Sequence, residues 1–191
     1  MLSLLGILAS GCLSTRSYVD PALGHLAYSD LSKGGPPASV YLTVEFQTRG
    51  KKNLAATSST YDRISTVLRS SGLFSAVQST GSQEEARLDI LMNNVGDIGK
   101  AVSKGIGTGL TLGLVGSMVT DGYEFKATYT APGKEPVTKV YQHALHSTIG
   151  NKQGPPGLKP MSTQEAFDQV VEELVLHLLQ DLQKDGTLGS G

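Results

Sequence analysis

Residues 40–47 read VYLTVEFQ, in which apolar and polar side chains alternate without exception. Successive side chains of a β-strand point to opposite faces, so one face of this segment is apolar and the other polar. The pattern therefore predicts a half-buried strand, whose apolar face carries Val40, Leu42, Val44 and Phe46. Gly50, followed by Lys51 and Lys52, indicates a turn with solvated charges.

Four further segments have the pattern of strands. Residues 74–78 predict a short strand and residues 87–95 a longer one. Residues 123–129 alternate in the same way, and the chain returns through residues 137–149 after Pro132-Gly133. Two alternating segments around a Pro-Gly turn predict a β-hairpin.

Two segments have helical periodicity. Ser59-x-x-Asp62 resembles a capping box, and the apolar stripe after it ends at Gly72, which predicts a helix of about 13 residues. Ser162-x-x-Glu165 is a second capping box before a longer stripe. That stripe consists of Phe167, Val170, Val171, Leu174, Leu178 and Leu182.

The predicted order of elements is β-α-β-β-β-β-α. Because each helix has one apolar stripe, a single sheet face can bury both helices. The sequence therefore predicts an α+β fold, in which two helices pack on one face of a mostly antiparallel sheet of about five strands.

The first twelve residues read MLSLLGILASGC and end in the only cysteine of the chain, Cys12. An apolar run from Leu2 to Leu8 before small residues is typical of a signal peptide, and it falls short of the roughly 18 apolar residues that span a bilayer. Ala9-Ser10-Gly11-Cys12 resembles the lipobox of bacterial lipoproteins. The alternative is an unmodified cysteine near a disordered end of the chain.

The lipobox resemblance implies that the thiol of Cys12 is alkylated by diacylglycerol and that the leader is removed before it. The new amino terminus would then be acylated, and several acyl chains together give stable anchoring in a membrane. Leu13 after the cysteine resembles the pattern of lipoproteins that are sorted to the outer membrane of Gram-negative cells. The expected location is the periplasmic face of that membrane.

The resulting organisation has one folded domain. Glycine, proline and polar residues before residue 38 indicate a tether, and a glycine-rich stretch interrupts the domain. The expected segments are a signal peptide (1–11), a lipidated tether (12–37), a single α+β domain (38–185) with a glycine-rich insert (99–120), and a flexible tail (186–191).

The glycine-rich stretch at 105–116 reads GIGTGLTLGLVG. It does not fit a dinucleotide-binding loop, because Leu110 occupies the place of the third glycine, and it lacks the Gly-Lys-Ser/Thr end of a phosphate loop. On a helix, Gly105, Gly109 and Gly113 would form a flat groove for a second helix, a second copy of the chain or lipid. The structural alternative is a connection across the sheet or an extra hairpin.

Composition and motifs give no sign of an enzyme. Sixteen Lys and Arg against seventeen Asp and Glu leave a net charge of −1, which argues against a nucleic-acid partner. The single cysteine excludes an internal disulfide and a CxxC site. His143 and His146 would project from opposite faces of a strand and could not easily share a metal ion. We expect no catalytic residues, metal or cofactor.

The chain resembles a broad group of proteobacterial envelope lipoproteins. The resemblance rests on Gly72-Leu73-Phe74-Ser75-x-Val77 after the predicted helix, and on Ala86-x-Leu88-Asp89-Ile90-Leu91. This arrangement is similar to that of LPS-assembly lipoproteins, ABC-transport auxiliary lipoproteins and the amino-terminal domain of TolB-like proteins, over about residues 40–95. It implies a non-enzymatic periplasmic protein that acts through a sheet edge or in an oligomer.

The leading hypothesis is a membrane-anchored lipoprotein that binds and assists or stabilises another envelope protein. One alternative is an immunity lipoprotein that blocks a secreted antibacterial toxin, such as a phospholipase. A third possibility is a homo-oligomeric ring or pore that uses the glycine-rich segment 105–116.

Overall fold

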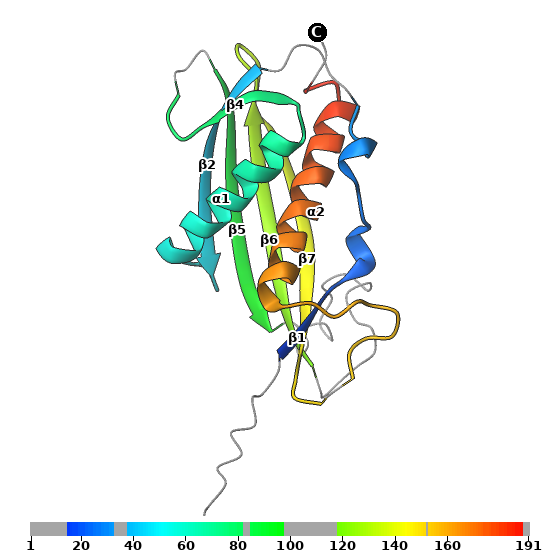
Figure 1. The fold of residues 1–191 in the computed structure, drawn as a ribbon. Coiled ribbons are helices and arrows are strands. Elements are labelled where there is room, and N and C mark those ends of the chain that lie inside the picture. Colours follow the sequence, from blue (N-terminus) through cyan, green and yellow to red (C-terminus); the bar gives the residue numbers. More distant parts are fainter. Residues whose placement is uncertain (1–14, 33–37, 82–84, 98–117, 152, 189–191) are drawn as a thin grey trace, which may run out of the picture.

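The computed structural model describes residues 15–32, 38–81, 85–97, 118–151 and 153–188. Within these ranges the chain forms two layers, with one seven-stranded sheet and two α-helices that lie together on one of its faces (Figure 1). The α-helices are α1 (Leu54–Ser70) and α2 (Thr163–Lys184), and short 3₁₀-helices lie at Pro21–Leu23 and Tyr28–Asp30.

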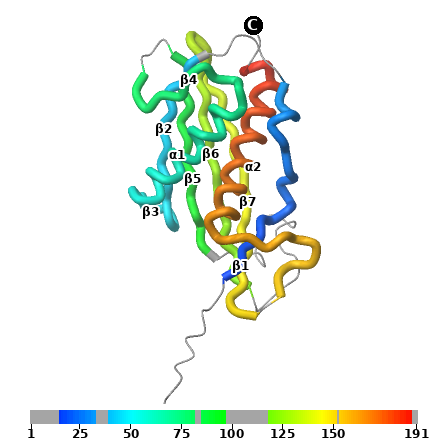
Figure 2. Tube along the Cα trace, in the orientation of Figure 1, coloured from blue at the N-terminus to red at the C-terminus, as the bar shows by residue number. Residues whose placement is uncertain are grey.

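The sheet is mixed. In chain order its strands are β1 (Thr15–Val19), β2 (Ala38–Thr48), β3 (Lys51–Lys52), β4 (Phe74–Gln78), β5 (Ala86–Asp97), β6 (Val119–Thr130) and β7 (Val137–Ile149). They lie in the spatial order β1-β7-β6-β5-β2-β3, and β4 pairs with the beginning of β2 (Figure 2). Strand β2 runs parallel to both β4 and β5, and the other neighbours are antiparallel.

The α+β class and the hairpin of β6 and β7 are confirmed, whereas the expected five strands and two helices fall short of the seven strands and of the 3₁₀-helices that accompany α1 and α2. Lys51 and Lys52 form a short strand that pairs with Thr48 and Gln47. The larger correction concerns the tether expected at 12–37. Residues 15–19 of it pair with β7 along their whole length, and residues 20–32 continue beside α2 (Figure 1).

Helix α1 begins earlier than the sequence predicted. Its N-cap is Asn53, whose Oδ1 accepts a hydrogen bond from the backbone N–H of Ala56. Ser59 lies inside the helix, where its hydroxyl donates to the carbonyl of Ala56, so it caps nothing. Gly72, with φ +71°, follows the end of the helix in the left-handed conformation that glycine accepts at no steric cost.

Helix α2 begins at the predicted capping box. The hydroxyl of Ser162 accepts from the Glu165 N–H, and the Glu165 carboxylate accepts from the Ser162 N–H. Beyond the helix, the expected flexible tail is partly ordered. Leu188 is buried in the core, and its N–H donates to the carbonyl of Leu182, which closes the last turn.

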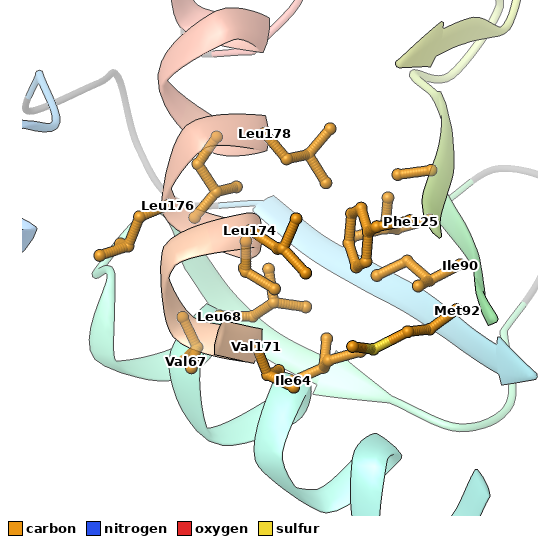
Figure 3. Packing of buried hydrophobic residues seen from close by; sticks show 14 of the residues in the cluster. Ile64, Val67, Leu68, Ile90, Met92, Phe125, Val171, Leu174, Leu176 and Leu178 are labelled. Atoms are coloured by element: carbon orange, nitrogen blue, oxygen red, sulfur yellow. The ribbon is translucent and has the colours of Figure 1, made fainter. Parts of the chain in front are cut away.

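The hydrophobic core lies between the two helices and the inner face of the sheet (Figure 3). Leu174, in the middle of α2, is completely buried there. Around it pack Ile64, Val67 and Leu68 of α1, Val171 and Leu178 of α2, and Ile90, Met92 and Phe125 of the sheet. No helix of the described residues is both long enough and apolar enough to cross a membrane.

Candidate functional site

The outer face of the sheet, turned away from both α-helices, carries rows of side chains that run across β2, β5, β6 and β7. The pairing register places Thr43, Asp89, Thr128 and Thr138 in one row, Glu45, Leu91, Lys126 and Val140 in the next, and Gln47, Asn93, Glu124 and Gln142 in a third. We call these three rows the outer face. Asp89 and Glu124 both belong to it.

Two of the four charged side chains in these rows, Asp89 and Glu45, are ion-paired. Arg87, next to the first row, donates from Nε to Asp89 Oδ2 over 2.7 Å, and Lys52 Nζ lies 3.1 Å from Glu45 Oε2. Hydrogen bonds from Gln47 and Lys52 lower the pKa of Glu45. Ion pairs on an exposed surface contribute little to the stability of the fold. Their main effect is to keep the outer face polar.

Lys126 differs from these groups, because it forms no ion pair with any residue that the structure describes. It stands in the middle row between Leu91 and Val140, whose side chain is 65% exposed. An open hollow of about 570 Å³ reaches this place, with Glu45, Arg87, Asp89 and Lys126 among its lining residues. A wide hollow lined by charges of both signs is better suited to contact with another protein than to binding of an apolar small molecule.

A second group of polar residues lies buried near the end of β1. His146 Nε2 is 2.9 Å from Asp20 Oδ2, and His146 Nδ1 is 2.9 Å from Thr120 Oγ1. Carboxylate, imidazole and hydroxyl follow one another here as they do in a catalytic triad. The exposed fractions are 1% for Asp20, 1% for His146 and 7% for Thr120, so a substrate could not reach the hydroxyl in this conformation.

This buried group holds the beginning of the chain on the sheet. Asp20 Oδ1 accepts from the Ala22 N–H over 2.8 Å and caps the first 3₁₀-helix, while Oδ2 binds His146 of β7. Tyr18 projects from the same face, next to His146. The loop before α2 crosses its ring so closely that a Cβ atom on Gly154 would lie 2.1 Å from the Tyr18 Cζ.

His143 lies on the opposite face from His146, as the sequence predicted, and belongs to a different cluster. Its Nε2 is 2.8 Å from Glu173 Oε2 of α2, and His25 Nδ1 is 3.2 Å from Glu173 Oε1, which also accepts from Gln169. We call these four residues the Glu173 cluster. Burial alone would raise the pKa of Glu173, but hydrogen bonds from His143, Gln169 and His25 and the charge of His143 outweigh burial and lower the pKa.

Besides the contact of His25 with Glu173, residues 20–32 are fixed to α2 at two further points. His177 Nε2 lies 3.1 Å from the carbonyl oxygen of Gly24. Gln183 donates to the carbonyl of Ser32 and accepts from its N–H, at 2.7 and 3.0 Å. Residues 20–32 are thus held along the second half of α2, from Glu173 to Gln183, and form part of the domain.

The lipidation and interaction residues singled out from sequence, Cys12, Gly105, Gly109 and Gly113, all lie outside the described residues. Within the described part of the chain, no group of three or more His, Cys, Asp or Glu side chains could hold a metal ion. Sequence reasoning missed Asp20, Thr120 and Glu173, because their partners are 126, 26 and 30 positions away and no local motif joins them.

No protein-family model matches the sequence, and no curated protein matches it. Several solved structures are similar to it at TM-scores of about 0.4. Rare lipoprotein B from Shewanella oneidensis is 7% identical, with a TM-score of 0.40, over 77% of this chain and 92% of that one. A minor lipoprotein from Acinetobacter baumannii is 10% identical, with a TM-score of 0.39, over 78% and 94%. The PelC dodecamer from Paraburkholderia phytofirmans is 16% identical, with a TM-score of 0.37, over 88% and 97%.

At these identities the similarity concerns the arrangement of helices and strands alone. Partners and assembly have to be argued from the residues of this chain.

Proposed function

We propose that the protein is a lipoprotein, anchored through Cys12, that binds another envelope protein with the outer face of its sheet and catalyses no reaction. The observation that carries the proposal is the outer face itself. Two helices cover one face of the sheet (Figure 1). On the other face Lys126 and Val140 pair side by side, and neither α-helix of the described residues lies over that face.

The chemistry of the outer face suits a protein partner. Thr43, Asp89 and Arg87 are already hydrogen-bonded to one another, so a partner would meet a surface whose polar groups are preorganised. Lys126 and the exposed Val140 would supply one free charge and one apolar contact near the centre of the sheet. Interfaces between proteins commonly combine a small apolar centre with polar surroundings.

The absence of an enzymatic role is also part of the proposal. The Asp20, His146 and Thr120 chain is the arrangement closest to a catalytic set among the described residues, and its hydroxyl is buried. Its contacts have a sufficient structural role, because they hold the first 3₁₀-helix on the sheet.

Site-specific photo-crosslinking in cells tests this proposal. A photoreactive amino acid at position 126 or 140 should give one discrete crosslinked product in the membrane fraction. Position 54 is the matched control, because Leu54 is 72% exposed but begins α1, on the helical side of the sheet. The Cys12→Ser variant should lose both the membrane fraction and the product.

The identity of the product decides between related functions. An envelope protein in the product supports the proposal, and a secreted toxin would instead favour an immunity protein. No product from either outer-face position, or the same product from position 54, would contradict the role of the outer face.

A further inference from the structure

Strand β1 begins very close to the cysteine that would carry the lipid. Only Leu13 and Ser14 separate Cys12 from Thr15, the first residue of β1. An extended chain advances at most ~3.6 Å per residue, so the Cα atoms of Cys12 and Thr15 can be no more than about 11 Å apart. If Cys12 is acylated, the end of the sheet at Thr15 has to lie next to the lipid surface.

Exposed apolar side chains lie at this same end. Thr15 pairs with Ile149, the last residue of β7, and Val119, the first residue of β6, pairs with Ser147 of β7. Ile149 is 53% exposed and Val119 is 41% exposed. Their register makes them diagonal neighbours on one face of the sheet, at a separation of roughly 7–8 Å.

These two side chains are half of the large hydrophobic side chains that the described residues leave exposed, the others being Leu54 and Val140. Two basic residues accompany them. Arg16 is exposed one residue after Thr15, and Lys159 is exposed two residues before Met161, which pairs with Ser17 of β1. An apolar pair beside cationic side chains suits the boundary between acyl chains and phosphate headgroups.

We infer that this end of the sheet, formed by Thr15, Val119 and Ile149, rests on the lipid bilayer. The inference depends on the proposed acylation of Cys12. It also specifies how the domain is oriented on the membrane. Val119 and Ile149 lie in the membrane interface, and β7 extends away from it. Val140 stands nine residues before Ile149 on that strand, about 30 Å further along an extended chain. The outer face is then held clear of the membrane, open to a partner.

Labelled cysteines in the full-length lipidated protein test the inference. A thioether at Cys12 leaves no thiol there, so Val119→Cys or Ile149→Cys would be the only labelled site. Each variant receives an environment-sensitive fluorophore and is reconstituted in phosphatidylethanolamine–phosphatidylglycerol vesicles, with nitroxide lipids as quenchers. Val140→Cys is the matched control, since it replaces an equally apolar and more exposed side chain far from the predicted contact.

We expect several-fold stronger quenching and a blue-shifted emission at positions 119 and 149 compared with position 140. Equal quenching at all three positions, or stronger quenching at 140, would overturn the inferred orientation while the anchor stands. Flotation of the same samples with the vesicles separates the two claims. A protein that carries no lipid and does not float overturns the anchor and the orientation together.

Discussion

His143 Nε2 of β7 lies 2.8 Å from Glu173 Oε2 of α2, and this contact joins the sheet to the helical layer inside the protein. Glu173 is only 4% exposed. A buried carboxylate is costly unless it is hydrogen-bonded, and here His25 and Gln169 satisfy the second oxygen. The Glu173 cluster therefore couples residues 20–32, α2 and β7 through one side chain.

The Glu173 cluster predicts a loss of stability in acid. The pKa of Glu173 is lower in the folded protein than its ordinary value of 4.5, so the unfolded chain takes up the proton first as the pH falls. The contribution of Glu173 is complete above about pH 4.5 and is lost as the pH falls through the folded pKa. At pH 7, Glu173→Gln should lower the free energy of unfolding by about 1–3 kcal/mol.

Urea unfolding of the wild-type protein and Glu173→Gln between pH 7 and pH 3 measures this effect. The difference between their free energies of unfolding should be largest at pH 7 and should shrink on acidification. Glu124→Gln, on the exposed outer face, is the control and should change stability by less than about 0.5 kcal/mol. A difference that does not change with pH would show that the charge of Glu173 has no part in the coupling.

The hydroxyl of Thr120 should matter for stability because it is the partner of a buried imidazole. Thr120→Val keeps the shape of the side chain but leaves His146 Nδ1 without a hydrogen bond, which should cost about 1–3 kcal/mol. Thr128→Val is matched to it, because the Thr128 hydroxyl also bonds one side chain, that of Thr138, but on the exposed outer face. Thermal unfolding should separate the two variants, and equal melting temperatures would disprove the structural role of Thr120.

The close contact between Gly154 and Tyr18 gives a prediction about the loop before α2. Gly154→Ala would place a methyl group inside the Tyr18 ring, so the ring or the loop must move, at a cost of about 1–3 kcal/mol. In a Tyr18→Ala background the same change should cost much less, since the ring is gone. A double-mutant cycle by urea unfolding measures this coupling. Additive effects would mean that the loop does not lie against Tyr18.

Sequence patterns predict those helices and strands whose formation depends on residues that are close together in the chain. The alternation at residues 40–47 matches β2, and Ser162 with Glu165 marks the first turn of α2. Asn53 shows where such reasoning fails. By residue type it is as good an N-cap as Ser59, but it lacks the capping-box spacing that Ser59 and Asp62 have.

Features that depend on distant partners could not be predicted from the sequence. Strand β1 has only two large apolar residues, Tyr18 and Val19, and its ladder is formed with residues about 130 positions away. The parallel pairing of β2 with β5 likewise has no local signature. The alternation did place His143 and His146 on opposite faces, yet it could not name Glu173 or Asp20 as their partners.

Mass spectrometry of the amino-terminal peptide of protein extracted from its native membranes tests the anchor most directly. The account predicts that this peptide begins at Cys12, that a diacylglyceryl group is attached to its sulfur, and that its amino group is acylated. A peptide that begins at Met1, with Cys12 still a free thiol, would contradict the anchor and the orientation derived from it.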